Sequence, residues 1–274
     1  MNLKFAQSSA LYFNYSLSFA IKDLAKLGYD GIEIWGGRPH MYRQDLNKEL
    51  EMIKMSLEET GLKVCNFIPA QFRYPSILCS NNQHIRRDSV QYICDAIDNA
   101  VAVRSPSVSL CPGMVLWDYS LKEGWDNLYN SLREIEDYCS DLPIRLLIEP
   151  AHKYESNLIL TIEDCIEVLN SLNSDKFGIL LDVGHCHVNN ENLENSLKLC
   201  ADYPLHIHID DNSGESDSHL IPGEGTIDFN IFYQSLKDIG YSGFVSAELG
   251  TSYIMKPTEA AEKTLQFFKK YFVD

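Results

Sequence analysis

The chain has 274 residues, 45% of them hydrophobic, and a formal net charge of -16, and this size and composition suit one α/β barrel domain. No apolar run reaches the roughly 18 residues of a membrane span, so no membrane association is expected, and the negative charge disfavours a nucleic-acid partner. The N-terminal residues lack the apolar core of a secretory signal, which predicts a cytoplasmic protein.

Short β-rich runs alternate with longer segments of helical periodicity along the chain. The predicted strands are Leu3–Gln7, Gly31–Trp35, Lys63–Ile68, Ser107–Leu110, Arg145–Glu149, Phe177–Asp182, Leu205–Ile209 and Gly243–Glu248. The predicted helices span residues 16–27, 47–60, 83–103, 120–140, 161–172, 192–202, 229–239 and 257–272. Eight strands, each followed by a helix, predict a single (β/α)8 TIM barrel that forms one domain over residues 1–274. A doubly wound sheet would usually have a glycine-rich loop after its first strand, and FAQSSALYF is no such loop.

The ends of the last four predicted strands carry the clearest chemical signal. Strand five ends at Glu149, strand six at Asp182 and strand eight at Glu248. In LHIHI, the seventh strand, apolar residues and imidazoles alternate with period two, so His206 and His208 share one face. Because the carboxyl ends of TIM-barrel strands form one rim, these groups should meet there.

Each of these residues also has a plain structural explanation. A carboxylate at a strand end is often a helix N-cap or a surface charge, and a lone histidine in a strand is often a core residue. We interpret His206, which lies deeper than His208, as such a core histidine, hydrogen-bonded inside the barrel. Four coincident positions on neighbouring strands nevertheless favour a metal site. Three carboxylates and one imidazole suit one divalent ion, with Mn²⁺ or Zn²⁺ favoured and Co²⁺ or Fe²⁺ as alternatives.

Several stretches of the chain resemble the xylose-isomerase-like barrels, and within them the ketose 3-epimerase branch of sugar epimerases and isomerases. They are LGYDGIEIWGGRPH (27–40), IEPAHKYESN (148–157), IHIDD (207–211), DSHLIPGEG (217–225) and AEL (247–249). The resemblance covers essentially the whole chain. It implies that Glu149, Asp182, His208 and Glu248 bind one divalent metal ion. It also implies that Glu155 and His185 bind hydroxyl groups of a carbohydrate substrate.

The same resemblance implies a metal-dependent epimerase or isomerase that acts on a ketose or ketose derivative. A metal ion on the substrate oxygens would stabilise the enediolate that forms when a carbon-bound proton leaves. Glu149 and Glu248, on opposite faces of the sugar, would remove one proton and return another, which inverts the carbon. A metal-dependent lyase or aldolase and a catalytically inactive sugar-binding barrel remain alternatives, and a homo-oligomer remains open.

The loop after the seventh strand departs from the epimerase pattern. DDNSGESDSH contains no Arg or Lys, although epimerases of this branch commonly hold the substrate with an arginine there. Asp217 and His219 resemble instead an Asp-x-His element of the endonuclease IV branch, so with His185 they could bind a second metal ion. We favour the alternative in which His185 binds a sugar hydroxyl while Asp217 and His219 order the loop through hydrogen bonds, and we keep both as candidate substrate contacts. In either case the two side chains should face the pocket from one side of an extended segment. The histidines that the nuclease branch has on strands two and three are missing from IEIWGG and NFIPAQF, which disfavours a DNA-repair nuclease.

Overall fold

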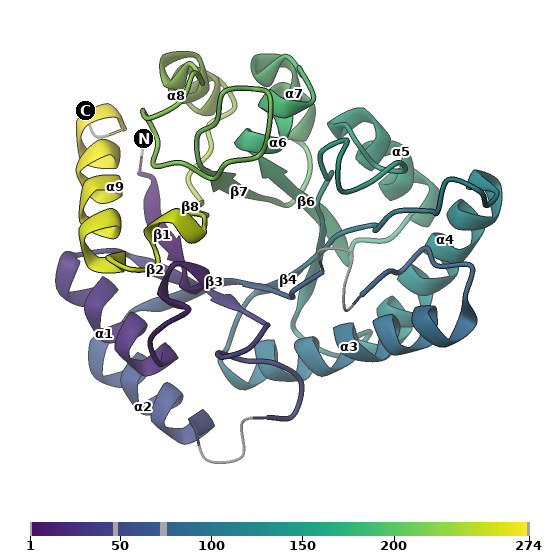
Figure 1. Cartoon of the computed structure of the whole chain (residues 1–274), viewed down its shortest axis with the longest axis horizontal. Helices are drawn as coiled ribbons and strands as arrows, with labels where there is room; N and C mark the ends of the chain where they lie inside the picture. Colours follow the sequence, from purple (N-terminus) through teal and green to yellow (C-terminus); the bar gives the residue numbers. More distant parts are fainter. Residues whose placement is uncertain (1, 46–48, 72–75, 273–274) are drawn as a thin grey trace.

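The predicted TIM barrel is confirmed by a computed structural model of the chain, which describes residues 2–45, 49–71 and 76–272 (Figure 1). Parallel strands pair in chain order, and the last closes against the first. The strands are β1 (Lys4–Ser8), β2 (Gly31–Trp35), β3 (Lys63–Ile68), β4 (Ser107–Leu110), β5 (Arg145–Ile148), β6 (Phe177–Asp182), β7 (Leu205–Ile209) and β8 (Phe244–Ala247).

Helices surround the closed sheet (Figure 1). They are α1 (Leu17–Leu27), α2 (Glu49–Thr60), α3 (Gln83–Ala102), α4 (Leu121–Tyr138), α5 (Ile162–Leu172), α6 (Val183–Val188), α7 (Leu193–Cys200), α8 (Phe229–Asp238) and α9 (Pro257–Tyr271), with the 3₁₀ helices η1 (Ser9–Tyr12) and η2 (Thr251–Tyr253). Local signals set their ends: Thr161 and Asp164 form a capping box at α5, and Gly28 ends α1 with φ +95°. Within the described ranges, no helix combines the length and the apolar character that crossing a membrane requires.

Several element boundaries differ from the sequence prediction by one or two residues, and two differences concern the site. Strands β5 and β8 end one residue early, so Glu149 and Glu248 follow their strands instead of ending them. Their N–H groups still continue the ladder, since Glu149 donates to Leu110 O over 3.0 Å and Glu248 to Ile209 O over 3.1 Å. The short helix α6 was not predicted, because six residues are too few to show a helical period.

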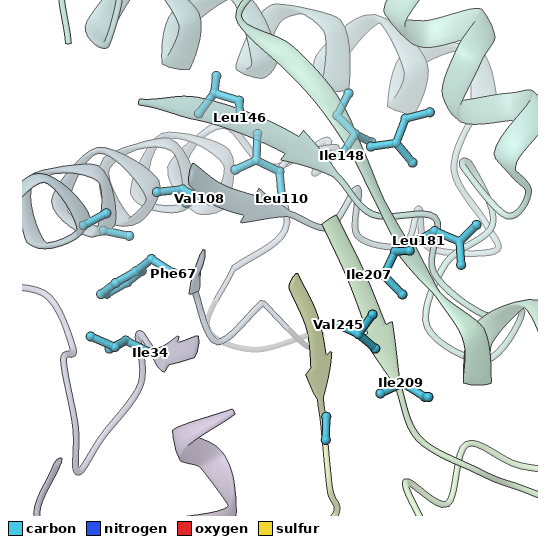
Figure 2. Close-up of a cluster of buried hydrophobic side chains, with 14 of the residues drawn as sticks. Ile34, Phe67, Val108, Leu110, Leu146, Ile148, Leu181, Ile207, Ile209 and Val245 are labelled. Atoms are coloured by element: carbon cyan, nitrogen blue, oxygen red, sulfur yellow. The ribbon is translucent and has the colours of Figure 1, made fainter. Parts of the chain in front are cut away.

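Alternate residues of the strands build two layers of different chemistry. Figure 2 shows the apolar one, which includes Ile34, Phe67, Val108, Leu110, Leu146, Ile148, Leu181, Ile207, Ile209 and Val245. Each such side chain contributes about 1.5–3 kcal/mol when it is fully buried. The residues between them face the other way. Among these, Glu33 of β2 contacts His208 of β7, and because those strands are not neighbours the contact crosses the barrel interior.

Candidate active site

Four side chains from consecutive strand ends meet at one point. Glu149 follows β5, Asp182 ends β6, His208 belongs to β7 and Glu248 follows β8. One potential ligand atom from each lies within 4.8 Å of the others. His208 Nδ1 is 2.8 Å from Glu248 Oε2 and 3.6 Å from both Glu149 Oε1 and Asp182 Oδ2. We call these four residues the strand-end cluster.

Two buried atoms of the strand-end cluster, Asp182 Oδ2 and His208 Nδ1, lack a hydrogen-bond partner. The other Asp182 oxygen, Oδ1, accepts from the His185 N–H over 2.8 Å and so caps α6. The carboxylate therefore has both the structural role of an N-cap and a free oxygen aimed at the cluster. An unpartnered buried polar atom costs about 1–3 kcal/mol.

The charges of the strand-end cluster are also unbalanced. It brings together the carboxylates of Glu149, Asp182 and Glu248, which are 2%, 2% and, for the Glu248 side chain, 16% exposed. No lysine or arginine of the described chain forms an ion pair with them. A divalent cation would balance this charge and give both unpartnered atoms a ligand. The residues present therefore fit a borderline ion of the Mn²⁺ or Zn²⁺ type.

The groups of the strand-end cluster shift each other's pKa values. Burial would raise the pKa of Asp182, but His185 and His208 lower it to about 2. Burial would lower the pKa of His208, but the charges of Glu33 and Glu248 raise it well above its ordinary value. The raised pKa favours the protonated form of His208 in the chain without a metal ion, so a cation would compete with that proton.

A second group of polar side chains gathers around the loop between β7 and α8, and two of its members, His152 and His185, come from elsewhere in the chain. Asp217 Oδ2 lies 2.8 Å from His219 Nε2, 3.5 Å from His185 Nε2 and 3.7 Å from His152 Nε2. His219 Nδ1 is 2.6 Å from Asp210 Oδ2. We call these five residues the loop cluster. The structure brings His185, Asp217 and His219 together, and it adds His152 and Asp210, which the sequence analysis did not single out.

Asp211 holds this loop in shape. Its Oδ2 accepts from the N–H groups of Gly223 and Gly225, each over 2.8 Å, and its Oδ1 accepts from Ile227 over 3.1 Å. A two-way backbone bridge also joins Asp211 to Leu220. A Cβ at Gly225 would meet the Asp211 carboxylate, so a larger residue cannot take that place without moving it. The hydrogen bonds of this one carboxylate thereby hold the conformation of the loop, whose residues Asp217 and His219 line the cavity.

The prediction of an extended segment at Asp217 and His219 is wrong in one respect. His219 has φ +44°, in the left-handed region that few non-glycine residues occupy. Both side chains still line the cavity. The His219 ring lies between Asp210 and Asp217, and although burial would lower the pKa of His219, those carboxylates raise it well above its ordinary value.

Both clusters face one cavity of about 490 Å³, a volume in the range of small-molecule sites. Its polar side is formed by residues that include Glu149, Glu155, His185, Asp217, His219 and Glu248. Its apolar side is formed by residues that include Ala10, Phe13, Trp35, Ile68, Pro69 and Leu249. The described lining residues include no lysine or arginine, in keeping with the loop sequence. Glu155 also lines the cavity, with Oε1 3.5 Å from His152 Nε2.

Two polar residues that touch the strand-end cluster were missed by the sequence analysis. The Cys111 thiol donates to Glu149 Oε2 over 3.3 Å, and Glu33 Oε2 lies 2.8 Å from His208 Nε2. The only sequence signal for Glu33 is a charged residue inside GIEIW, a strand otherwise predicted to be buried. His206 lies buried inside the barrel as interpreted, 3.5 Å from Glu33, but its Nε2 makes no hydrogen bond.

Known proteins of similar sequence and fold agree with this architecture. The sequence matches the family described as xylose isomerase-like TIM barrels over residues 21–271, which confirms the resemblance. Fructoselysine 3-epimerase of Shigella flexneri is 30% identical over 254 residues, which cover 92% of each chain. The crystal structure of a D-tagatose 3-epimerase-like protein matches with a TM-score of 0.80 and 26% identity, covering 98% of this chain and 99% of that one. The structure of the IOLI protein with a bound zinc atom matches in fold, with a TM-score of 0.82, 22% identity, and 99% and 100% coverage.

Proposed function

The chain belongs to the family of xylose isomerase-like TIM barrels, and from that premise we propose that it is a divalent-metal-dependent epimerase or isomerase of a ketose or ketose derivative. The observation that carries the proposal is the strand-end cluster, in which Asp182 Oδ2 and His208 Nδ1 are buried without partners among three carboxylates. The name of the Shigella flexneri relative, fructoselysine 3-epimerase, supports a ketose derivative as the substrate.

Glu149, Asp182, His208 and Glu248 would hold the ion in this proposal. Mn²⁺ or Zn²⁺ is favoured, with Co²⁺ or Fe²⁺ as alternatives, since these ions accept mixed carboxylate and imidazole ligands. The zinc atom bound to the IOLI protein is consistent with this choice. When bound, the ion would supply Lewis-acid stabilisation of the negative charge that develops on the substrate oxygens.

Glu149 and Glu248 are the proposed proton-transfer pair. They belong to β5 and β8, two strands separated by β6 and β7, and both line the cavity. A sugar lying between them would lose a carbon-bound proton to one carboxylate and receive a proton from the other on the opposite face. The Cys111 thiol, which donates to Glu149 Oε2, restricts that carboxylate to one orientation.

Glu155, His185, Asp217 and His219 are the proposed contacts to sugar hydroxyls. His185 Nδ1 is bonded to Pro150 O over 3.0 Å, which leaves Nε2 directed towards Asp217. A second metal ion at His185, Asp217 and His219 is the alternative. We favour the hydroxyl contacts because the carboxylates and imidazoles of the loop cluster already compensate each other's charge. The acidic lining disfavours a phosphorylated substrate, which proteins usually bind with Arg or Lys.

The experiment that tests the function is incubation of the Mn²⁺-loaded protein with a panel of ketoses and ketose derivatives in D₂O, followed by NMR. The expected product is an epimer with deuterium at the inverted carbon, because the two carboxylates exchange protons with water. An epimer without deuterium would contradict the two-carboxylate mechanism. A cleaved fragment would identify a lyase or aldolase, and a bound but unchanged sugar would identify an inactive sugar-binding barrel.

A further inference from the structure

Glu33 of β2 is a buried carboxylate to which the proposed function assigns no role. Its side chain is 0% exposed, and both of its oxygens accept hydrogen bonds. Asn66 Nδ2 donates to Oε1 over 2.6 Å, and Ser246 Oγ donates to Oε2 over 2.9 Å. The Nε2 atom of His208 lies 2.9 Å from Oε1 and 2.8 Å from Oε2. A carboxylate so fully partnered in the interior of the barrel has one defined position.

The contact with Glu33 determines which ring nitrogen of His208 has a lone pair available to the strand-end cluster. A carboxylate can only accept, so the His208 nitrogen next to Glu33 is the one that carries hydrogen. In the neutral ring the other nitrogen, Nδ1, then keeps its lone pair. That atom is the one that faces Glu149, Asp182 and Glu248 without a hydrogen bond.

We propose that Glu33 is a positioning residue: by accepting the Nε2–H of His208 across the barrel interior, it fixes the tautomer and the ring orientation that present Nδ1 to the strand-end cluster. The inference rests on the proposed metal-binding function. A carboxylate partner also makes an imidazole a more basic ligand, and loss of such an outer partner typically weakens metal binding about 10- to 100-fold.

The surroundings of Glu33 are arranged to keep it in place. Ser107 Oγ donates to Asn66 Oδ1 over 2.6 Å, which orients the amide so that its Nδ2 faces Glu33. The hydrogen bonds thus run from β4 through β3 and β2 to β7. His206 Nε2 lies 3.5 Å from Glu33 Oε1, and its ring meets that of His208 at 82°. His206 contacts Glu33 but is no part of the strand-end cluster.

The first test compares metal binding by Glu33→Gln with binding by the unaltered chain. The amide keeps the size and an acceptor oxygen but removes the charge. Mn²⁺ affinity, followed by electron paramagnetic resonance, should fall about 10- to 100-fold, and the visible spectrum of the Co²⁺ protein should change. Ser131→Ala is the matched control, because it removes a buried hydrogen bond, from Ser131 Oγ to Leu78 O, that has no contact with the Glu33–His208 network. Its affinity should stay within about threefold of the unaltered chain, since the Glu33–His208 pair is intact.

Equal Mn²⁺ affinity and an equal Co²⁺ spectrum in Glu33→Gln would overturn the positioning role. An equal loss in Ser131→Ala would also overturn it, because the effect would then be one of general destabilisation. If the unaltered chain binds no divalent ion, the proposed function fails as well. If it binds the ion and Glu33→Gln binds it equally, only the positioning inference fails.

A second measurement needs no variant, and so it holds even if Glu33→Gln does not fold. Long-range ¹H–¹⁵N NMR of the Zn²⁺-loaded protein reports which ring nitrogen of His208 carries hydrogen. The inference expects hydrogen on Nε2 and a metal-shifted resonance for Nδ1. Hydrogen on Nδ1, or a metal-shifted Nε2, would overturn it.

Discussion

The strand-end cluster and the loop cluster face the same cavity but are positioned by different means. In the strand-end cluster, the register of the strands sets the positions of the side chains: Asp182 pairs with His208, and His208 pairs with Ser246. In the loop cluster, Asp217 and His219 belong to residues 210–228, whose shape depends on the hydrogen bonds of one carboxylate, Asp211. Strand-borne groups are held more precisely than loop-borne groups, which suits the first cluster to proton transfer and the second to contacts that adapt to a substrate.

The two clusters also differ in charge. Three carboxylates outnumber the single imidazole of the strand-end cluster, whereas the loop cluster has two carboxylates and three imidazoles. In the loop cluster, Asp210 and Asp217 lie against imidazoles: burial would raise the pKa of Asp217, but His185 and His219 lower it well below its ordinary value. The comparison teaches that the first cluster has an excess of carboxylates that a cation would balance, whereas the second has imidazoles enough to balance its own carboxylates, although both contain buried atoms without a hydrogen-bond partner.

The largest expected effect comes from removing one of the two carboxylates proposed to transfer protons, Glu149 or Glu248. Glu149→Gln and Glu248→Gln should each lower kcat by about 10²- to 10⁴-fold, because a proton acceptor or donor is lost, while a metal ion still binds weakly. Initial rates and metal content measured on the same preparations check this. Glu215→Gln, an exposed change in the β7–α8 loop, is the control and should retain full activity. Near-normal kcat in either variant with normal metal content would remove that residue from the mechanism.

The next effect concerns the metal ion itself. Asp182→Ala should reduce bound metal from about one equivalent per chain to a small fraction, because it removes a charged ligand. Since Asp182 also caps α6, the loss of the cap alone would cost about 1 kcal/mol of stability. Asp182→Asn keeps a good N-cap but loses the charge, so it separates the two roles. Elemental analysis is the measurement, and full occupancy in both variants would refute the assignment.

A smaller effect is expected in the loop cluster. His219→Ala should raise KM about tenfold with unchanged metal content, because a hydroxyl contact is lost and no ligand of the strand-end cluster is touched. His84→Ala, an exposed histidine of α3, is the matched control. Loss of a second metal equivalent would instead support a dinuclear site at His185, Asp217 and His219. Unchanged KM and metal content would show that the loop takes no part in function.

The smallest expected effect is a difference between the metal-free and the metal-loaded protein in how stability depends on pH. Burial would lower the pKa values of His185, His208 and His219, but neighbouring carboxylates raise all three above the ordinary value. Their contribution to the metal-free protein is fully present below about pH 6.5 and is lost as pH rises through the raised values. Metal affinity changes in the opposite direction, because the ion needs an unprotonated His208. Urea unfolding between about pH 6 and about pH 9, with chelator or with Mn²⁺, measures both slopes, and equal slopes would contradict the prediction.

The order of the elements and the strand-end cluster could be read from the sequence for a physical reason. Side chains of a strand alternate with period two, and parallel strands of a barrel end at one rim, so local pattern and topology together place Glu149, Asp182, His208 and Glu248 side by side. Each of these positions depends on its own strand and on the strand order, both of which the sequence shows. Their roles as ligands remain a prediction.

What the sequence did not show depends on contacts between distant segments. Glu33 and His208 are 175 residues apart, and their meeting across the barrel depends on strand register, including a shift between β2 and β3 at Ile32 and Glu33. The left-handed backbone of His219 likewise depends on a loop that Asp211 holds with hydrogen bonds. Alternation places a side chain on one face of a strand, but only the closed barrel decides which side chain it meets there.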